Sequence, residues 1–344
     1  MIYKLKPHII YAYIRTNIND KHSTNDLLRQ KNLRFSSRTN HIKSRWQELK
    51  KMNPSIELIR LIAVILIVFT HTRNELESGV TYFIIERLPT FGTALLSLIS
   101  GYLYYNVSRK KNHLFKKKIK SLAVPYIIAN TSILLVVLIL YYAFGYNALH
   151  RLSYDFSIIS EGIFALNSPP INPPTYFIRD ILVIFSIIAL LTQKEFKALF
   201  ILIPIILFGT LILRLDVAFL FLVGCIYSKF ENKLKKKTLI ILTIIITTII
   251  SAWFIDYLKF PTSFLLFVLL INLQFKFYNT GRYSYLLHLY HSPIIVITYP
   301  IFNLYIDNPL LKIIAQIMTA LLFIYMIFLI SKKYEFLKIL SGGR

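Results

Sequence analysis

The sequence is poor in charged residues, in acidic residues and in cysteine. Charged residues make up only 16% of the 344 residues, while hydrophobic residues make up 56%, which excludes both a soluble globular domain and a disordered chain. The one cysteine, Cys225, lies inside an apolar run, so an internal disulfide and a cysteine metal cluster are excluded. Only 16 acidic residues accompany 40 Lys and Arg. Because the basic residues gather in short segments between apolar runs, the charge indicates membrane topology rather than nucleic-acid binding.

The apolar residues form about ten runs that follow one another along most of the chain. The runs cover approximately residues 56–72, 88–105, 122–144, 176–191, 198–213, 215–227, 239–255, 261–275, 285–305 and 309–330. This pattern predicts an all-α fold, a polytopic integral membrane bundle of about ten transmembrane helices, some of them short and therefore tilted or bent. When loops are assigned to alternate sides, one side is richer in Lys and Arg, which predicts that both termini are cytoplasmic. The expected location is the inner, or cytoplasmic, cell membrane.

The sequence divides into a basic N-terminal extension at 1–53, a transmembrane domain at 54–333 and a cytoplasmic tail at 334–344. The extension has no long apolar run and is neither a signal peptide nor a membrane span. One interpretation is a surface helix on anionic lipid. The other is that translation starts at Met52 and that the preceding residues are upstream sequence read in frame.

Three ionisable residues, Glu57, Arg60 and His71, interrupt the first apolar run. Arg60 and His71 are eleven positions apart, which in a continuous helix places them within roughly 20° of each other and about 16 Å apart along the axis. Ionisable groups at membrane depth cost about 3 kcal/mol each on insertion scales and usually face the bundle interior or a wet cavity. A polar stripe along this helix is therefore a functional hypothesis. The alternative is a snorkelling Arg60 at the inner headgroups with an interfacial His71.

Two later stretches also place polar groups in apolar surroundings. Arg179 and Asp180 lie just inside the predicted outer end of the fourth run, at a depth similar to that of His71. They form either part of a site or a structural ion pair with another helix. Ser100 and Gly101 interrupt the second run, where small residues favour close contact between helices.

Two histidines, His288 and His291, lie one turn apart on one side of the ninth run. Together with His71 they would supply three imidazole ligands for a metal ion. No Asp or Glu in that run could orient these rings, however, and the spacing is a weak signal. We therefore predict no metal site.

Five segments, in order along the chain, carry a resemblance to a known family. They are Glu57, Arg60 and His71 in the first run, ISGYLYY at 99–105, the basic run at 116–126 that ends in Pro and Tyr, TYFIRDILV at 175–183 and SYLLHLYHSP at 284–293. In this order they resemble the acyltransferase 3 family of membrane acyltransferases, over a region from Pro54 to about Ile330. Each motif alone is loose, whereas five in order are fairly specific.

The sequence departs from the usual pattern of that family at four positions. Glu57 stands where the family usually has Asp, Tyr176 where it usually has Trp, His288 where it often has Tyr, and Lys120 where many members have Arg. The last change has the largest chemical effect, because Lys cannot bind phosphate in the bidentate way that Arg does.

The resemblance implies an enzyme that transfers an acyl group, expected to be acetyl, to a hydroxyl of a cell-surface or lipid-linked polysaccharide. Acetyl-CoA is the expected donor substrate, and no permanently bound cofactor is expected. Arg60, Lys118 and Lys120 are the expected cytoplasmic contacts of the CoA phosphates. His71 is the expected general base, and Arg179 is expected to stabilise the oxyanion or seat the acceptor. The sequence allows both direct transfer and a transient acetyl-His71. Supporting roles are expected for Glu57, Ser100, Tyr126, Asp180, Ser284 and His291.

The expected partners are the acyl-CoA and glycan substrates, membrane lipid and glycan-synthesis machinery, with no nucleic acid. A polysaccharide exporter or flippase is the alternative, because buried charges and aromatic side chains also suit a glycan path. The register of Arg60 with His71 favours the enzyme, since a permeation path does not require it.

Overall fold

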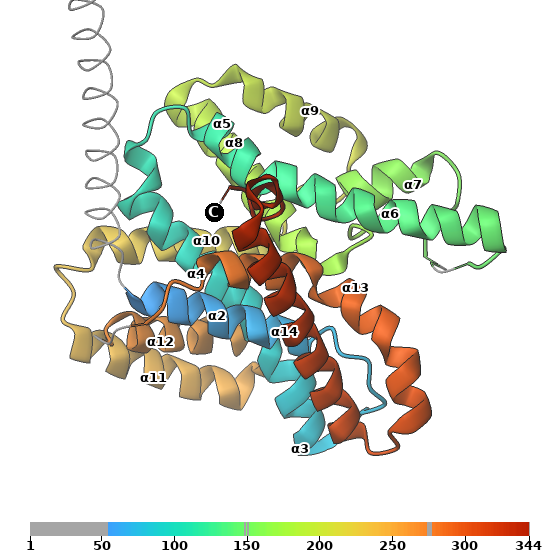
Figure 1. Cartoon of the computed structure of the whole chain (residues 1–344). Coiled ribbons are helices and arrows are strands. Elements are labelled where there is room, and N and C mark those ends of the chain that lie inside the picture. The colour runs from blue at the N-terminus through green and yellow to red at the C-terminus, as the bar shows by residue number, and fades with distance from the viewer. Residues whose placement is uncertain (1–53, 148, 150, 274–276, 344) are drawn as a thin grey trace, which may run out of the picture. The chain divides into compact units, whose positions relative to one another are not determined.

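A computed structural model describes residues 54–147, 149, 151–273 and 277–343 (Figure 1), so the predictions for residues 1–53 lie outside the described residues. The described part is helical and contains no strand. Its ten longest α-helices are α2 (Pro54–Phe69), α4 (Phe91–Asn106), α6 (Val124–Phe144), α8 (Tyr176–Gln193), α9 (Leu199–Phe208), α10 (Leu215–Phe230), α11 (Lys236–Trp253), α12 (Lys259–Ile271), α13 (Gly281–Tyr305) and α14 (Pro309–Lys333). Each predicted apolar run overlaps one of these helices, which confirms the all-α fold.

Five helical segments in the described part are long and apolar enough to cross a membrane. They are Gly79–Lys110, Leu114–Phe144, Pro173–Gln193, Lys236–Trp253 and Pro309–Lys333. The helix α9 has only ten residues and contains Pro204, so it reaches about 15 Å, roughly half the thickness of the hydrocarbon core. The count of ten membrane spans therefore stays a prediction, although each of the ten apolar runs overlaps a helix.

The centre of the bundle is α4, which packs against α2, α10 and α12. A Cβ atom at Gly101 would overlap the backbone oxygen of Phe221 on α10, and one at Gly224 would overlap that of Leu98 on α4. The two backbones are therefore in direct contact, as expected where small residues line a helix interface in a membrane. The predicted close contact is confirmed at Gly101, while Ser100 donates a hydrogen bond within its own helix.

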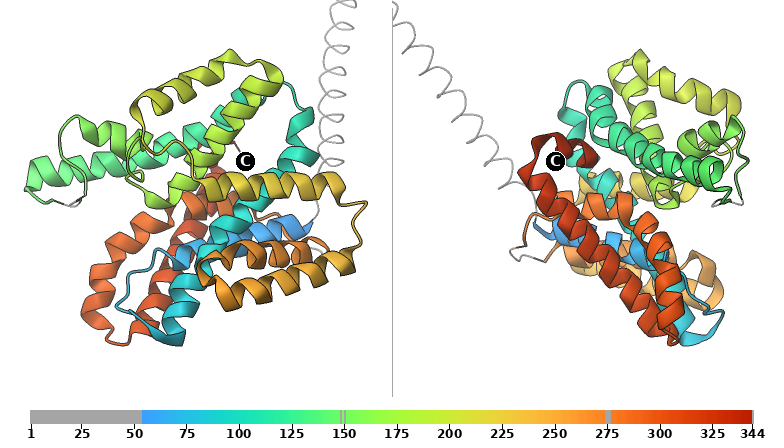
Figure 2. Two further views of the ribbon diagram at one scale, coloured as in Figure 1. Left: turned by 180° about the vertical axis from the view of Figure 1, so that it is seen from behind. Right: turned by 45° about the vertical axis from the view of Figure 1, so that its right-hand side comes forward.

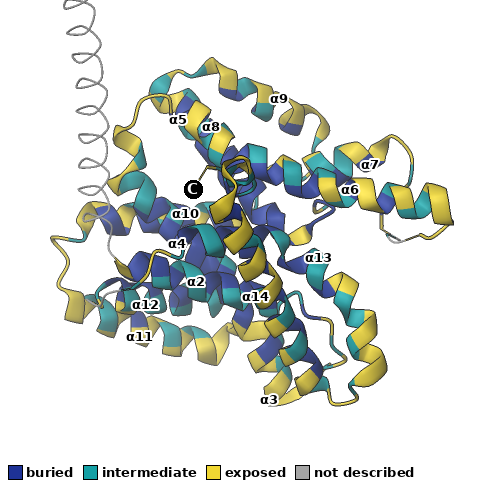
Figure 3. Ribbon diagram, viewed as in Figure 1, coloured by how far each residue is buried: buried dark blue, intermediate teal, exposed yellow. Residues whose placement is uncertain are grey.

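Two helix pairs lie beside this centre. The helices α13 and α14 pack side by side, and α13 also contacts α2 (Figures 1 and 2). The helix α11 packs against α12 but is otherwise exposed (Figure 3), and of its 18 residues only Thr243 is buried. A helix that is apolar and this exposed is expected to face lipid.

Residues 335–341 form a 3-10 helix, η9, that folds back against the bundle instead of leaving it. It contacts α6, α13 and α14. Gly342, which follows it, lies against the backbone of Ser121 in the π-helical segment η4 (Ile119–Ala123). Gly342 has φ +69°, a conformation in which glycine is favoured. The segment that the sequence separates as a tail thus belongs to the same compact unit as the helices.

Candidate active site

His71 lies in the turn that follows α2 and not on the helix itself. The helix ends at Phe69, and the amides of His71 and Thr72 donate to the carbonyls three residues earlier, at 3.1 Å each. This tighter winding interrupts the α-helical repeat. The prediction that Arg60 and His71 share one continuous helical stripe was therefore wrong in its geometry, because the eleven-residue repeat assumes a helix that continues through His71.

The turn that carries His71 is held by a buried glutamine on α14. Gln316 accepts a hydrogen bond from the Arg73 amide at 2.9 Å, and its own amide group donates to the Arg73 carbonyl at 2.9 Å. Gln316 is fully buried and also donates to Lys312 within its own helix. Both backbone hydrogen-bonding groups of a residue two positions after His71 are thus fixed by one side chain.

His71 contacts His291 of α13. The two ring centroids are 5.3 Å apart and the rings are tilted by 53°. His291 is fully buried, and its Nδ1 lies 2.6 Å from the Leu287 carbonyl oxygen. Because a carbonyl only accepts hydrogen bonds, Nδ1 carries the proton and Nε2 has the lone pair. Within the described part of the chain, that Nε2 is buried and has no hydrogen-bond partner.

The second histidine of α13, His288, joins this region to the start of α8. Its ring meets Phe177 edge to face, with centroids 5.8 Å apart. Close by, Asn172 donates to the Leu289 carbonyl at 2.7 Å, and Asn130 accepts from the Asn172 amide at 3.1 Å. The loop before α8 is therefore fastened to α13 next to both histidines. In the sequence, the only signal of Asn172 is its place between two proline pairs, which does not indicate a functional residue.

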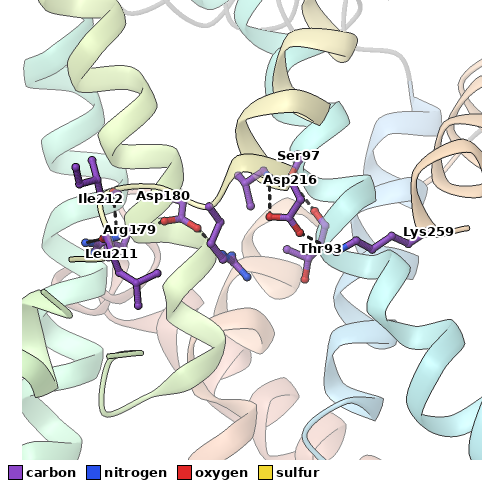
Figure 4. Close-up of polar contacts among 10 residues, drawn as sticks. Thr93, Ser97, Arg179, Asp180, Leu211, Ile212, Asp216 and Lys259 are labelled. Carbon is purple, nitrogen blue, oxygen red and sulfur yellow. Dashed lines mark hydrogen bonds and ion pairs between the residues drawn. The ribbon is translucent and has the colours of Figure 1, made fainter. Parts of the chain in front are cut away.

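Arg179 is buried and makes most of its contacts with backbone carbonyls (Figure 4). It donates to the carbonyls of Phe164 at 3.3 Å, Ile212 at 3.3 Å and Leu211 at 2.5 Å, and to Asp180 at 3.4 Å. These contacts engage four of the five N–H groups of a guanidinium. The main effect of Arg179 in this structure is to fix the loop before α10.

Asp180 is fully buried and pairs with Arg214, a residue that no motif in the sequence marks. The Arg214 Nε donates to the carboxylate at 2.6 Å. The guanidinium of Arg214 lies 4.5 Å from the centre of the Tyr176 ring. Its Nη2 and the Tyr176 hydroxyl are both buried without a hydrogen-bond partner among the described residues. Asp180 therefore forms an ion pair with a residue that precedes another helix. The Nη2 group of Arg214 has no hydrogen-bond partner among the described residues, whereas four of the five N–H groups of Arg179 are engaged.

At the opposite end of α2, Glu57 and Arg60 form an ion pair 2.7 Å long. The start of α13 covers this pair, and a Cβ at Gly281 would lie 2.8 Å from the Arg60 guanidinium. Thr280 donates to the Glu57 carbonyl at 3.2 Å. A larger residue at this position would therefore displace the ends of the Arg60 and Glu57 side chains, without a clash between the two backbones.

The remaining predicted site residues lie on other elements. Lys118 lies 3.7 Å from the Phe185 ring centre, and Lys120 is exposed on η4. The Tyr126 hydroxyl donates to the Ile163 carbonyl at 2.6 Å. Ser284 is fully buried, and its hydroxyl has no partner in the described residues. The structure thus brings His71 together with His291, and Glu57 with Arg60, while the two lysines lie on a segment that packs on α8.

Comparison with known proteins gives one match. A family model described as an acyltransferase domain matches residues 53–331. No curated protein and no solved structure matches the chain. Among the described residues, no three His, Cys, Asp or Glu side chains are grouped so that they could hold a metal ion.

Proposed function

The chain belongs to the acyltransferase 3 family of membrane acyltransferases, and from this premise we propose that it transfers an acetyl group from acetyl-CoA to a hydroxyl of a cell-surface or lipid-linked polysaccharide. The family model supports the acyl transfer. The observation that best supports the site is the contact between His71 and the buried His291. The acetyl group, the glycan and the inner membrane belong to the proposal.

In the proposed reaction, His71 is the general base. It removes the proton of the acceptor hydroxyl as that oxygen attacks the thioester carbonyl of acetyl-CoA. The tetrahedral intermediate then collapses, the C–S bond breaks, and the CoA thiolate takes the proton from the imidazolium of His71. The products are the acetyl ester and CoA.

His291 is proposed to orient His71 and to stabilise its imidazolium form. A centroid separation of 5.3 Å allows facing ring nitrogens to approach within about 3 Å, which is hydrogen-bond range. Since Nδ1 of His291 donates to Leu287, its Nε2 is available as an acceptor for an N–H of His71. A buried acceptor that favours one tautomer and one ring orientation is the usual partner of a catalytic histidine.

The negative charge that develops on the thioester oxygen has to be stabilised by a hydrogen-bond donor or a cation. We propose the cluster of Arg179, Asp180 and Arg214 for this role or for seating the acceptor. Arg179 remains the candidate from the sequence, but four of its N–H groups are engaged. Arg214 is the better placed donor within the cluster, because its buried Nη2 has no partner in the described part and its ion pair with Asp180 fixes the cation that would stabilise the oxyanion.

On the cytoplasmic side, Arg60, Lys118 and Lys120 are proposed to meet the CoA phosphates. The ion pair with Glu57 uses one nitrogen of Arg60, and a guanidinium has five donors, so phosphate binding is compatible with the pair. Both termini are proposed to lie in the cytoplasm, and glycan-synthesis machinery is the proposed supplier of the acceptor.

Acetyl transfer by the purified protein tests this proposal. Acetyl-CoA consumption in nanodiscs should be seen with the unaltered protein and be lost in His71→Ala. His113→Asn is a matched control, because His113 is exposed and has φ 56°, a conformation that Asn tolerates. Loss of an O-acetyl mass from surface glycan in cells that carry His71→Ala would identify the acceptor. Unchanged acetylation at matched protein levels would reject the assignment and favour a glycan exporter.

A further inference from the structure

Two buried hydrogen-bond donors lie next to each other at the start of α8. The Tyr176 hydroxyl and the Nη2 group of Arg214 are both buried, and neither has a hydrogen-bond partner among the described residues. The Tyr176 residue as a whole is only 8% exposed. A buried donor without an acceptor destabilises a folded protein, so such a group calls for an explanation. A ligand that supplies the acceptor would satisfy both donors.

The two donors belong to one site. The guanidinium carbon of Arg214 lies 4.5 Å from the centre of the Tyr176 ring, and that of Arg179 lies 5.4 Å from it. Cations at these distances are attracted to an aromatic ring, so the two guanidinium groups help to fix the ring. Because a donor lies about 3 Å from the oxygen that it binds, this spacing allows the hydroxyl and Nη2 to bind a single oxygen atom.

The site offers donors and few acceptors, which indicates the kind of oxygen that it binds. One carboxylate oxygen of Asp180 accepts from Arg179 at 3.4 Å, and the other accepts from Arg214 at 2.6 Å (Figure 4). A guanidinium cannot accept a hydrogen bond at all. A sugar hydroxyl must also donate its own proton. An oxygen that only accepts, such as the oxyanion of a tetrahedral intermediate, therefore fits this site better.

The start of α8 also contacts the helix that carries the two histidines. Phe177, which follows Tyr176, meets the His288 ring edge to face, with centroids 5.8 Å apart. His291, which contacts His71, lies one turn further along α13. The two donors therefore lie in the same region of the bundle as the proposed general base.

We propose that Tyr176 is a catalytic residue, and that its hydroxyl and the Nη2 group of Arg214 together bind the thioester oxygen while it carries negative charge. This rests on the proposed acetyl transfer and adds the second donor of the oxyanion site. As the acceptor oxygen forms its bond to the carbonyl carbon, the π electrons of the carbonyl move onto its oxygen. They return to re-form the carbonyl as the C–S bond breaks. Tyr176 donates a hydrogen bond throughout and keeps its proton.

The variant Tyr176→Phe tests the proposal, because it removes only the hydroxyl. No hydrogen bond to a described residue is lost, so the thermal unfolding temperature should stay the same or rise. In contrast, kcat should fall about 100-fold to 1,000-fold, as for the loss of one oxyanion donor. Both KM values should change little, because the oxyanion exists only beyond the ground state. Rates are measured in nanodiscs with acetyl-CoA and with surface glycan extracted from cells that carry His71→Ala.

Tyr283→Phe is the matched control. The Tyr283 hydroxyl donates to the Leu321 carbonyl at 3.1 Å and so joins α13 to α14. Its removal should lower the unfolding temperature and leave kcat unchanged, which is the opposite of the effect expected at Tyr176. Arg214→Lys tests the other donor, since it keeps a cation beside Asp180 but has no Nη2. This variant should also lower kcat.

Each other result of these measurements counts against the proposal. A kcat equal to that of the unaltered protein in Tyr176→Phe or in Arg214→Lys would overturn it while the proposed function stands. A lower unfolding temperature of Tyr176→Phe together with a lower kcat would show a structural role instead. A higher KM for the glycan at unchanged kcat would show that the donors bind the acceptor. Absence of acetyl transfer by the unaltered protein would overturn the proposed function and this proposal with it.

Discussion

Replacing Gln316 by leucine should impair catalysis through the placement of His71. The variant keeps the size of a fully buried side chain but removes both hydrogen bonds to the backbone of Arg73, each 2.9 Å long. A hydrogen bond contributes about 0.5 to 1.5 kcal/mol net, so the turn loses about 2 kcal/mol. If that energy holds His71 in its working position, kcat falls roughly 30-fold. The KM for acetyl-CoA should stay unchanged, because the donor phosphates are proposed to bind elsewhere.

The structure offers a matched control for Gln316. Gln193, at the end of α8, fixes another backbone segment in the same way, since it accepts from the Leu114 amide at 3.0 Å and donates to the Lys111 carbonyl at 2.9 Å. Gln193→Leu should therefore lower the thermal unfolding temperature by a comparable amount while kcat is retained. Both variants are compared in nanodiscs by acetyl-CoA kinetics and thermal unfolding. An equal loss of stability with no difference in kcat would refute a positioning role for Gln316.

Three further predictions concern the site, the packing and the topology. His71→Ala should lower the transfer rate about 100-fold to 10,000-fold, whereas His291→Ala should cost about 0.5 to 1.5 kcal/mol, as for one supporting hydrogen bond; rates at matched protein levels check this order. Gly101→Leu should destabilise the contact between α4 and α10 by about 1 to 3 kcal/mol, the usual cost of overpacking. A thermal unfolding temperature equal to that of the unaltered protein would contradict this prediction. A cysteine at Asn147 should react with a membrane-impermeant thiol reagent in intact cells and one at Asn112 should not; the reverse labelling would overturn the assigned orientation.

The helices themselves could be predicted from the sequence, because hydrophobic length is a local property. A long run of apolar residues that must satisfy its own backbone hydrogen bonds in lipid forms a helix wherever it lies. Each predicted run overlaps a helix, and Gly101 was expected at a helix contact. The ends of the helices could not be predicted in the same way. The helix α2 ends at Phe69, before His71, and Gln316 of a distant helix holds the backbone of Arg73 just beyond that turn.

The candidate residues were also visible in the sequence, because an ionisable side chain in an apolar run is costly unless it has a use or a partner. What the sequence could not show is which partner each one has. Arg214 lies 34 positions from Asp180, and Gln316 lies 243 positions from Arg73. Periodicity relates residues within one helix and carries no information about which helices meet.

The amino-acid sequence alone thus determined the helical membrane fold, the family and the short set of polar residues from which a site could be built. Tertiary packing decided the rest. It placed His71 beside His291, paired Asp180 with Arg214, and engaged most of Arg179 with backbone carbonyls. The reason is that these contacts depend on how distant helices approach one another, and that approach is set by close packing at positions such as Gly101 and Gly224.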